Sequence, residues 1–180
     1  MKIGLVRHFK VKHPFPKKTL LSKSEVINWF NEYDNNINIE YKKVDLLQIN
    51  WERCYSSPMI RALKTASHIY PGEILEVKEL KELEILGRLS NRLKLPFIIW
   101  GIIVRVNFFI SNNDTRKFKD GLIGFVDKLI RKDKNNTLIV SHWFVMQVIE
   151  KELIRRGFTG NNFKPNEYGR VSVFENKPKK

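Results

Sequence analysis

Short apolar runs of strand length alternate along this chain with longer stretches in which apolar residues recur at helical spacing. The apolar runs cover residues 2–6, 51–56, 74–77, 137–140 and 171–174. The helical pattern covers residues from about 22 to 33, 58 to 70, 115 to 131 and 144 to 156. Because the run at 137–140 shows no polar alternation, it predicts a central strand that is buried on both faces. Strands that alternate with helices predict a three-layer α/β/α domain around a mainly parallel central sheet.

Residues with special backbone preferences mark the ends of several predicted elements. Ser22 or Ser24 would cap the first helix with its side-chain oxygen. Pro58 would open the second helix, at a position where its missing N–H costs nothing. The Asn-rich stretch 34–38 predicts a turn, and Gly157 would end the helix at 144–156.

Residues 95–110 form an almost wholly apolar segment, interrupted by Arg105 and Asn107. The segment is shorter than the ~20 residues that a helix needs to span a bilayer. A buried or partly exposed helix is therefore the favoured interpretation, and a helix that touches a membrane surface is the alternative. We expect a helical cap or insertion around residues 88–113, with its apolar side packed on the domain and Arg105 near solvent or an anion.

The composition fits one folded domain over residues 1–180. Hydrophobic residues make up 42% of the chain, which is enough for a core of its own. Cys54 is the only cysteine, so no internal disulfide can form, and we expect it to be a core residue rather than a nucleophile. No apolar signal segment follows Met1, and together with the cysteine usage this predicts a cytoplasmic protein.

The chain is strongly basic. Its 33 Lys and Arg residues exceed its 19 Asp and Glu residues, which gives a formal net charge of +14. Such a charge favours anionic partners, namely phosphorylated metabolites, nucleic acid or an acidic membrane surface. We expect a phosphorylated small-molecule substrate, with nucleic acid and membrane contact as less favoured partners. A basic surface that serves solubility alone is the other interpretation of this charge.

Basic and histidine side chains directly follow two of the predicted strands. Arg7 and His8 come at the end of the first strand, and His142 follows the strand at 137–140. In an open parallel sheet, ligands bind beyond the carboxyl ends of the strands. Arg61 lies one turn into the helix after the second strand, so its side chain can reach back over the same edge. We therefore expect these four side chains to meet in space.

This set of side chains suits the transfer of a phosphoryl group to an imidazole. An arginine fork binds two phosphate oxygens, and catalysis of phosphoryl transfer is mainly positioning and electrostatic stabilisation. Neighbouring positive charges would keep His8 neutral, as a nucleophile requires. Glu82 is the natural proton donor for the leaving oxygen. The sequence lacks an evident cluster of metal ligands, so we predict neither a metal nor another cofactor.

The chain resembles the histidine phosphatase superfamily, which includes phosphoglycerate mutases and many small phosphatases. The resemblance rests on four stretches in the family's order: Arg7-His8, residues 56–66, Leu80-Lys81-Glu82 and Val140-Ser141-His142. The most specific is SSPMIRALKTA at residues 56–66, which is similar to the family's Ser-Ser-Pro-x-x-Arg-Ala-x-x-Thr-Ala segment. The other stretches resemble its Arg-His-Gly motif, its acid-bearing Leu-Arg-Glu stretch and its second histidine motif.

The resemblance implies a phosphoglycerate mutase-like fold and a role for each motif residue. His8 would be the phosphorylated nucleophile, and Glu82 would be the proton donor. Arg7, Arg61 and His142 would form the phosphate pocket. We also expect two further residues, Ser57 and Lys10, to contact the substrate.

Several residues depart from the family's pattern. Phe9 and Trp143 replace the two motif glycines, so these bulky side chains must narrow the site or turn away into the core. The spacing from Glu82 to Gly87 differs by one residue from the family's, which makes Glu84 a second candidate for the acid. These departures argue against a standard phosphoglycerate mutase.

The sequence thus predicts a metal-independent phosphatase that hydrolyses a phosphomonoester through a phosphohistidine on His8. One alternative is a catalytically retired phosphatase fold that binds an anionic partner, which the replaced glycines and the net charge motivate. Another is a phosphotransferase of the phosphoglycerate mutase type, which would return the phosphoryl group to a substrate.

Overall fold

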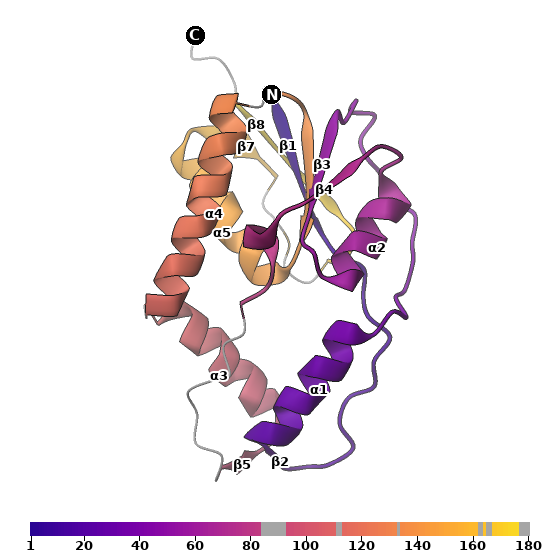
Figure 1. Cartoon of the computed structure of the whole chain (residues 1–180), viewed down its shortest axis with the longest axis vertical. Coiled ribbons are helices and arrows are strands. Elements are labelled where there is room, and N and C mark those ends of the chain that lie inside the picture. Colours follow the sequence, from indigo (N-terminus) through magenta and orange to yellow (C-terminus); the bar gives the residue numbers. More distant parts are fainter. Residues whose placement is uncertain (84–92, 111–112, 133, 162–163, 165–166, 177–180) are drawn as a thin grey trace.

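The computed structural model describes residues 1–83, 93–110, 113–132, 134–161, 164 and 167–176 (Figure 1). Within these residues, a six-stranded sheet runs through the molecule. Its strands, in spatial order, are β4 (Ile74–Glu76), β3 (Arg53–Ser56), β6 (Thr137–Ser141), β1 (Lys2–Arg7), β8 (Val171–Asn176) and β7 (Phe158–Gly160). The first four strands in this order are parallel to one another, whereas β8 and β7 are antiparallel to their neighbours. The prediction of a mainly parallel sheet is confirmed.

Helices cover both faces of the sheet, as a three-layer α/β/α domain requires. α2 (Ile60–Ile69) lies on one face, and α4 (Asn113–Lys132) and α5 (Trp143–Arg155) lie on the other (Figure 1). Alternate residues of β6 serve the two layers: Ile139 packs with α4 and α5, whereas Leu138 and Val140 pack with α2. All five residues of β6 are buried, which confirms the predicted central strand.

Three neighbouring strands end at the same level, and this register positions the site. Val6 of β1 is paired with Val140 of β6, which in turn is paired with Ser56 of β3. The ladder continues past the strand ends, where the N–H of Ser57 donates to the carbonyl of Val140 at 3.0 Å. The residues that follow these strands therefore emerge at one edge of the sheet, and His8 is among them.

The ends of the helices agree with the sequence at most positions. Ser22 caps α1 (Lys23–Asn35) through a capping box, and Gly157 follows α5 with a φ of 85°, which glycine adopts without strain. The prediction that Pro58 opens the second helix is wrong, because α2 begins further along the chain. The turn predicted at 34–38 begins late, since α1 continues through Asp34.

A small subdomain lies beyond the end of the sheet. It contains α1, α3 (Phe97–Phe109) and an antiparallel pair of two-residue strands, β2 (Leu21–Ser22) and β5 (Lys94–Leu95) (Figure 1). The indole of Trp100 is fully buried against Leu21 and Val26, and its N–H donates to the carbonyl of Leu21 at 2.9 Å. Trp100 therefore fixes α3 against α1.

The helix predicted within residues 95–110 is confirmed, but its expected packing is only partly right. Trp100 faces inward, whereas Ile98, Ile102 and Val106 are 76%, 49% and 50% exposed. Arg105 is exposed, as expected, and its guanidinium lies over a ring of the core, that of Trp143, at 5.3 Å from the ring centroid. Among the described residues, no helix combines the length and apolarity that crossing a membrane would take.

The contrast between the two sides of α3 gives a stability prediction. Trp100→Ala should lower the free energy of unfolding by about 3–5 kcal/mol, because it removes a buried indole and leaves a cavity. Ile98→Ala, on the same helix, should change it by less than about 0.5 kcal/mol, because that side chain is exposed. Denaturant unfolding of both variants measures the difference. Equal effects would contradict the inward packing of Trp100.

Candidate active site

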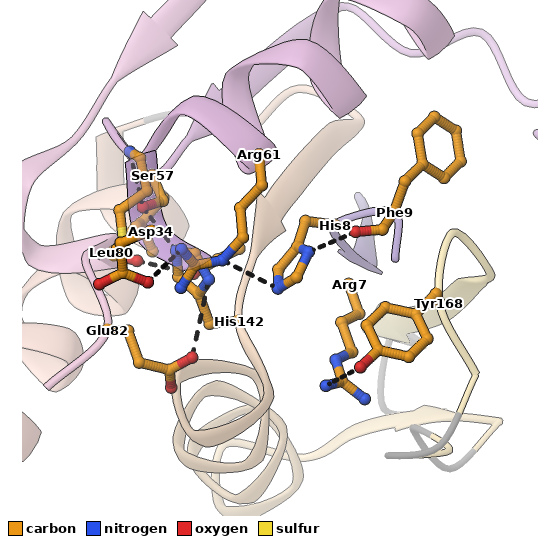
Figure 2. Close-up of polar contacts among 12 residues, drawn as sticks. Arg7, His8, Phe9, Asp34, Ser57, Arg61, Leu80, Glu82, His142 and Tyr168 are labelled. Carbon is orange, nitrogen blue, oxygen red and sulfur yellow. Dashed lines mark hydrogen bonds and ion pairs between the residues drawn. The ribbon is translucent and has the colours of Figure 1, made fainter. Parts of the chain in front are cut away.

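The two motif histidines meet at the carboxyl edge of the sheet. His8 follows β1 and His142 follows β6, and their ring centroids lie 5.1 Å apart. His8 is 3% exposed and His142 is fully buried. Figure 2 shows the arginines of the two motifs, Arg7 and Arg61, beside this pair. The structure thus brings together side chains from three stretches that lie far apart in the sequence, namely Arg7 with His8, Arg61, and His142.

The hydrogen bonds of His8 define its protonation. Its Nδ1 lies 2.6 Å from the carbonyl oxygen of Phe9, and its Nε2 lies 3.2 Å from Nε of Arg61 (Figure 2). A carbonyl can only accept and a guanidinium N–H can only donate, so Nδ1 carries the proton and Nε2 carries a lone pair. Burial, and after it the charge of Arg61, lower the pKa of His8 well below 6.5. His8 is therefore a neutral imidazole whose Nε2 is free of a proton.

Arg61 is buried between His8 and a carboxylate that the sequence analysis did not single out. Its Nη1 forms an ion pair with Oδ1 of Asp34 at 2.6 Å, and its guanidinium lies 5.1 Å from the ring centroid of Tyr33. Asp34 occupies the last turn of α1, where the helix dipole disfavours a negative charge. One signal in the sequence could have indicated this contact. Asp34 is an acidic residue at the end of a helix whose last turn contains no basic residue, so a cation from elsewhere in the chain is expected beside it.

Arg7 is held by a second residue that the sequence analysis missed. Its Nη2 donates to the hydroxyl of Tyr168 at 2.9 Å, and its guanidinium lies over the Tyr168 ring (Figure 2). The next residue, Gly169, donates its N–H to the carbonyl of Arg7 at 2.8 Å. Gly169 has a φ of 59°, and a Cβ there would lie 2.5 Å from the Phe9 ring, so only glycine fits. The segment before β8 thereby closes one side of the site.

His142 links Ser57 to Glu82. Its Nε2 is hydrogen-bonded to Oγ of Ser57 at 2.8 Å, and its Nδ1 lies 3.6 Å from Oε2 of Glu82. Because Ser57 Oγ also accepts from the N–H of Met59 at 3.3 Å, its own hydrogen is available to Nε2 of His142. The proton of His142 then sits on Nδ1, toward Glu82. Burial, followed by the charge of Arg61, lowers the pKa of His142 well below 6.5.

Glu82 lies beside His142, and its pKa is raised. It follows the short 3-10 helix Lys78–Leu80, which is tied to β6 where Oγ of Ser141 donates to the carbonyl of Leu80 at 2.7 Å. Burial raises the pKa of Glu82 to about 7, and the charge of Arg61 partly offsets this effect. Glu82 also lines a surface cavity that includes Lys78 and other residues. A proton can therefore reach it from solvent, although both histidines are buried.

The two residues that replace the motif glycines do not fill the space between the histidines. Phe9 is fully buried in the core layer of α2, and its N–H donates to Oγ1 of Thr65 at 2.8 Å. Of the two outcomes that the sequence left open for Phe9, the structure shows the turn into the core (Figure 2). Trp143 begins α5 and packs against the opposite core layer.

The remaining candidates lie elsewhere or outside the described part of the chain. Lys10 is exposed and forms an ion pair with Glu40 at 3.9 Å rather than with a residue of this cluster. Glu84, the second candidate for the acid, lies outside the described residues. Cys54 is fully buried, as expected of a core residue, and burial raises the pKa of its thiol to about 12. Within the described ranges, no group of three or more His, Cys, Asp or Glu residues could hold a metal ion.

The whole fold is similar to that of a phosphoserine phosphatase of known structure. A histidine-to-alanine variant of phosphoserine phosphatase from Entamoeba histolytica, in complex with phosphoserine, matches with a TM-score of 0.57 and 16% sequence identity, over 98% of this chain and 91% of that chain. The ecdysone phosphate phosphatase from Bombix mori, in complex with tungstate, matches with a TM-score of 0.48 and 12% identity, over 93% of this chain and 83% of that one. No family model and no curated protein sequence matches this chain. The first likeness confirms the expected fold.

The contact between Asp34 and Arg61 yields a prediction about anion binding. Asp34→Ala should lower the free energy of unfolding by about 1–3 kcal/mol, because a buried guanidinium loses its counterion. Inorganic phosphate should raise the melting temperature of this variant more than that of the wild type, because phosphate can replace the lost carboxylate at Arg61. Asp120→Ala, which removes an exposed carboxylate of α4, is the control. An equal phosphate effect in all three proteins would contradict the prediction.

Proposed function

We propose that this chain, which has the fold of the histidine phosphatase superfamily, is a metal-independent phosphatase that works through a phosphohistidine on His8. The observation that carries the proposal is the state of His8. Its Nδ1 hydrogen is held by the carbonyl of Phe9, and its Nε2 lone pair points toward the buried Arg61. A neutral, oriented imidazole beside a fixed positive charge is what attack on a phosphate dianion requires.

The first step transfers the phosphoryl group to His8. The phosphate of the substrate binds between the guanidinium groups of Arg7 and Arg61, and the N–H of His142 contributes a further donor. Nε2 of His8 attacks phosphorus as the bond from phosphorus to the leaving alcohol oxygen breaks. Glu82, protonated at that moment, gives its proton to this oxygen. The products of the step are an alcohol and a phosphohistidine.

The second step returns the enzyme to its starting state. The carboxylate of Glu82 takes a proton from water, and the water oxygen attacks phosphorus. The bond between phosphorus and Nε2 of His8 breaks, and inorganic phosphate leaves. The pKa of about 7 lets Glu82 serve as acid and then as base near neutral pH. No step requires a metal ion or another cofactor.

The alternatives have less support. The aromatic residues at the glycine positions were one reason to consider a catalytically retired fold. Phe9, however, is buried in the core and does not separate His8 from His142. A phosphotransferase of the phosphoglycerate mutase type would return the phosphoryl group from His8 to a substrate hydroxyl, and an assay of phosphoglycerate interconversion would detect that activity. In the mechanism above, water accepts the phosphoryl group. Phosphoserine, which is named in the complex of the E. histolytica protein, is a first substrate to test.

The nucleophile can be tested directly. Wild-type protein should hydrolyse p-nitrophenyl phosphate in the presence of EDTA, and His8→Ala should lower kcat by at least ~10³-fold because the attacking atom is gone. His68→Ala, which removes an exposed histidine, should leave turnover unchanged. Brief reaction with radiolabelled substrate should leave label on the wild type that is stable in alkali and lost in acid. Unchanged turnover in His8→Ala would refute the proposal.

The acid can be tested through pH and leaving group. Below the low pKa of His8 the nucleophile is protonated, and above the pKa of about 7 Glu82 has lost its proton, so kcat/KM for an alkyl phosphate should fall on both sides. Glu82→Gln should remove the alkaline limb and slow an alkyl phosphate far more than p-nitrophenyl phosphate, whose leaving group needs little protonation. Glu79→Gln is the matched control, and the same effect in Glu84→Gln instead would assign the acid to Glu84.

A further inference from the structure

An apolar stripe runs along the outer side of α3. Ile98, Ile102, Val106 and Ile110 recur every four residues and therefore share one face, with Ile110 capping the helix. Their exposed fractions are 76%, 49%, 50% and 56%. Ile99, beside them, is 39% exposed. Contiguous exposure of this kind is unusual on a monomer that stays in water and marks an interaction surface.

The stripe has a fixed orientation. On the opposite side of the same helix, Trp100 is fully buried and hydrogen-bonded to the carbonyl of Leu21, and Ile103 packs in the same cluster. Turning the stripe inward would pull this indole out of its pocket. α3 therefore presents its isoleucines to the outside as a consequence of how its inner side is anchored.

The surroundings of the stripe are apolar and basic. Phe15, 77% exposed, contacts the ring of Phe97 at 5.9 Å between centroids and extends the patch at the start of α3. α3 contains no acidic residue, and Arg105 borders the stripe. Exposed basic residues flank the patch along the chain, at Lys17 and Lys18, at Lys94, and at Arg116 and Lys117, with Asp114 and Glu25 as acidic neighbours.

We propose that this face of α3 lies on an anionic lipid surface. Isoleucines and a phenylalanine that can enter the acyl boundary, with lysines and arginines at the rim, are the features of a helix that binds in the plane of a bilayer. The helix has 13 residues, which is too short to span a bilayer and long enough to lie on one. The sequence made membrane contact the less favoured interpretation of this segment, and the exposed stripe reverses that preference.

The charge of the chain favours an anionic lipid surface over a second copy of the chain as the partner of this face. Pairing two copies through this face would bring together two chains with a formal net charge of +14 each, whereas an acidic bilayer attracts the same charge. α3 also lies near the carboxyl edge of the sheet, because Arg105 lies over the ring of Trp143, the residue that follows His142. A chain bound in this way would hold the carboxyl edge of its sheet close to the lipid surface.

Vesicle binding tests the proposal on the full chain. Wild-type protein should partition onto vesicles of phosphatidylcholine mixed with phosphatidylserine, and less onto phosphatidylcholine alone. Ile98→Asn combined with Ile102→Asn should lower partitioning by about tenfold or more, because the side chains that enter the bilayer are removed. Ile37→Asn combined with Ile154→Asn changes two isoleucines that are 62% and 52% exposed elsewhere, and should leave partitioning unchanged.

Further measurements report how deeply α3 enters the bilayer and whether a second copy of the chain binds this face instead. Ile102→Trp should gain fluorescence that brominated lipids quench, whereas the fully buried Trp100 should not respond. Three results would each overturn the proposal. These are no binding to phosphatidylserine vesicles at low salt, binding that the stripe variant retains in full, and a dimer without lipid that only the stripe variant dissociates. Retained turnover of p-nitrophenyl phosphate by the stripe variant would show that it is folded, so that its weaker binding reflects the missing isoleucines and not a damaged fold.

Discussion

The buried guanidinium of Arg61 is the constraint on which the rest of the site depends. Its charge cannot be removed by deprotonation, and the residue is 3% exposed, so it requires compensation inside the protein. Asp34 supplies the negative charge and Nε2 of His8 supplies a lone pair. The same cation lowers the pKa of both histidines and limits the rise in that of Glu82. After burial, which is the larger cause, this one cation thus favours the neutral form of both histidines and the charged form of Glu82.

Much of the fold could be predicted because its long elements have a clear period. The uninterrupted apolar run at 137–140 indicated a central strand, and the capping preference of serine placed the start of α1 at Ser22 or Ser24, of which Ser22 is the cap. The two-residue strands β2 and β5 are too short to show a period, so they were missed. The packing of α3 could not be read from the sequence either. A helix that is apolar on every side carries no sign of which side faces the core, and only Trp100 in its pocket decides this.

The candidate site was predictable as far as its residues follow strands. The carboxyl ends of β1, β3 and β6 are in register at one edge of the sheet. The positions of the motifs after these strands therefore sufficed to predict that His8, Arg61 and His142 lie together. Asp34 and Tyr168 were missed because neither follows a strand at that edge. They reach the arginines only through the tertiary placement of α1 and of the segment before β8, which no local pattern encodes.

The position of β1 in the sheet determines the order in which the protein can be assembled. β1 lies between two strands that are synthesised long after it: Ile3 is paired with Thr137 of β6 and with Phe174 of β8. Until those segments leave the ribosome, the apolar residues of β1 have no native partners, and closing such long loops is slow. The segment that carries Tyr168 arrives just before β8. A nascent chain would therefore need protection from aggregation until β6 and β8 have been synthesised, and the contacts of Arg7 with Tyr168 and Gly169 would form only after that segment has been added.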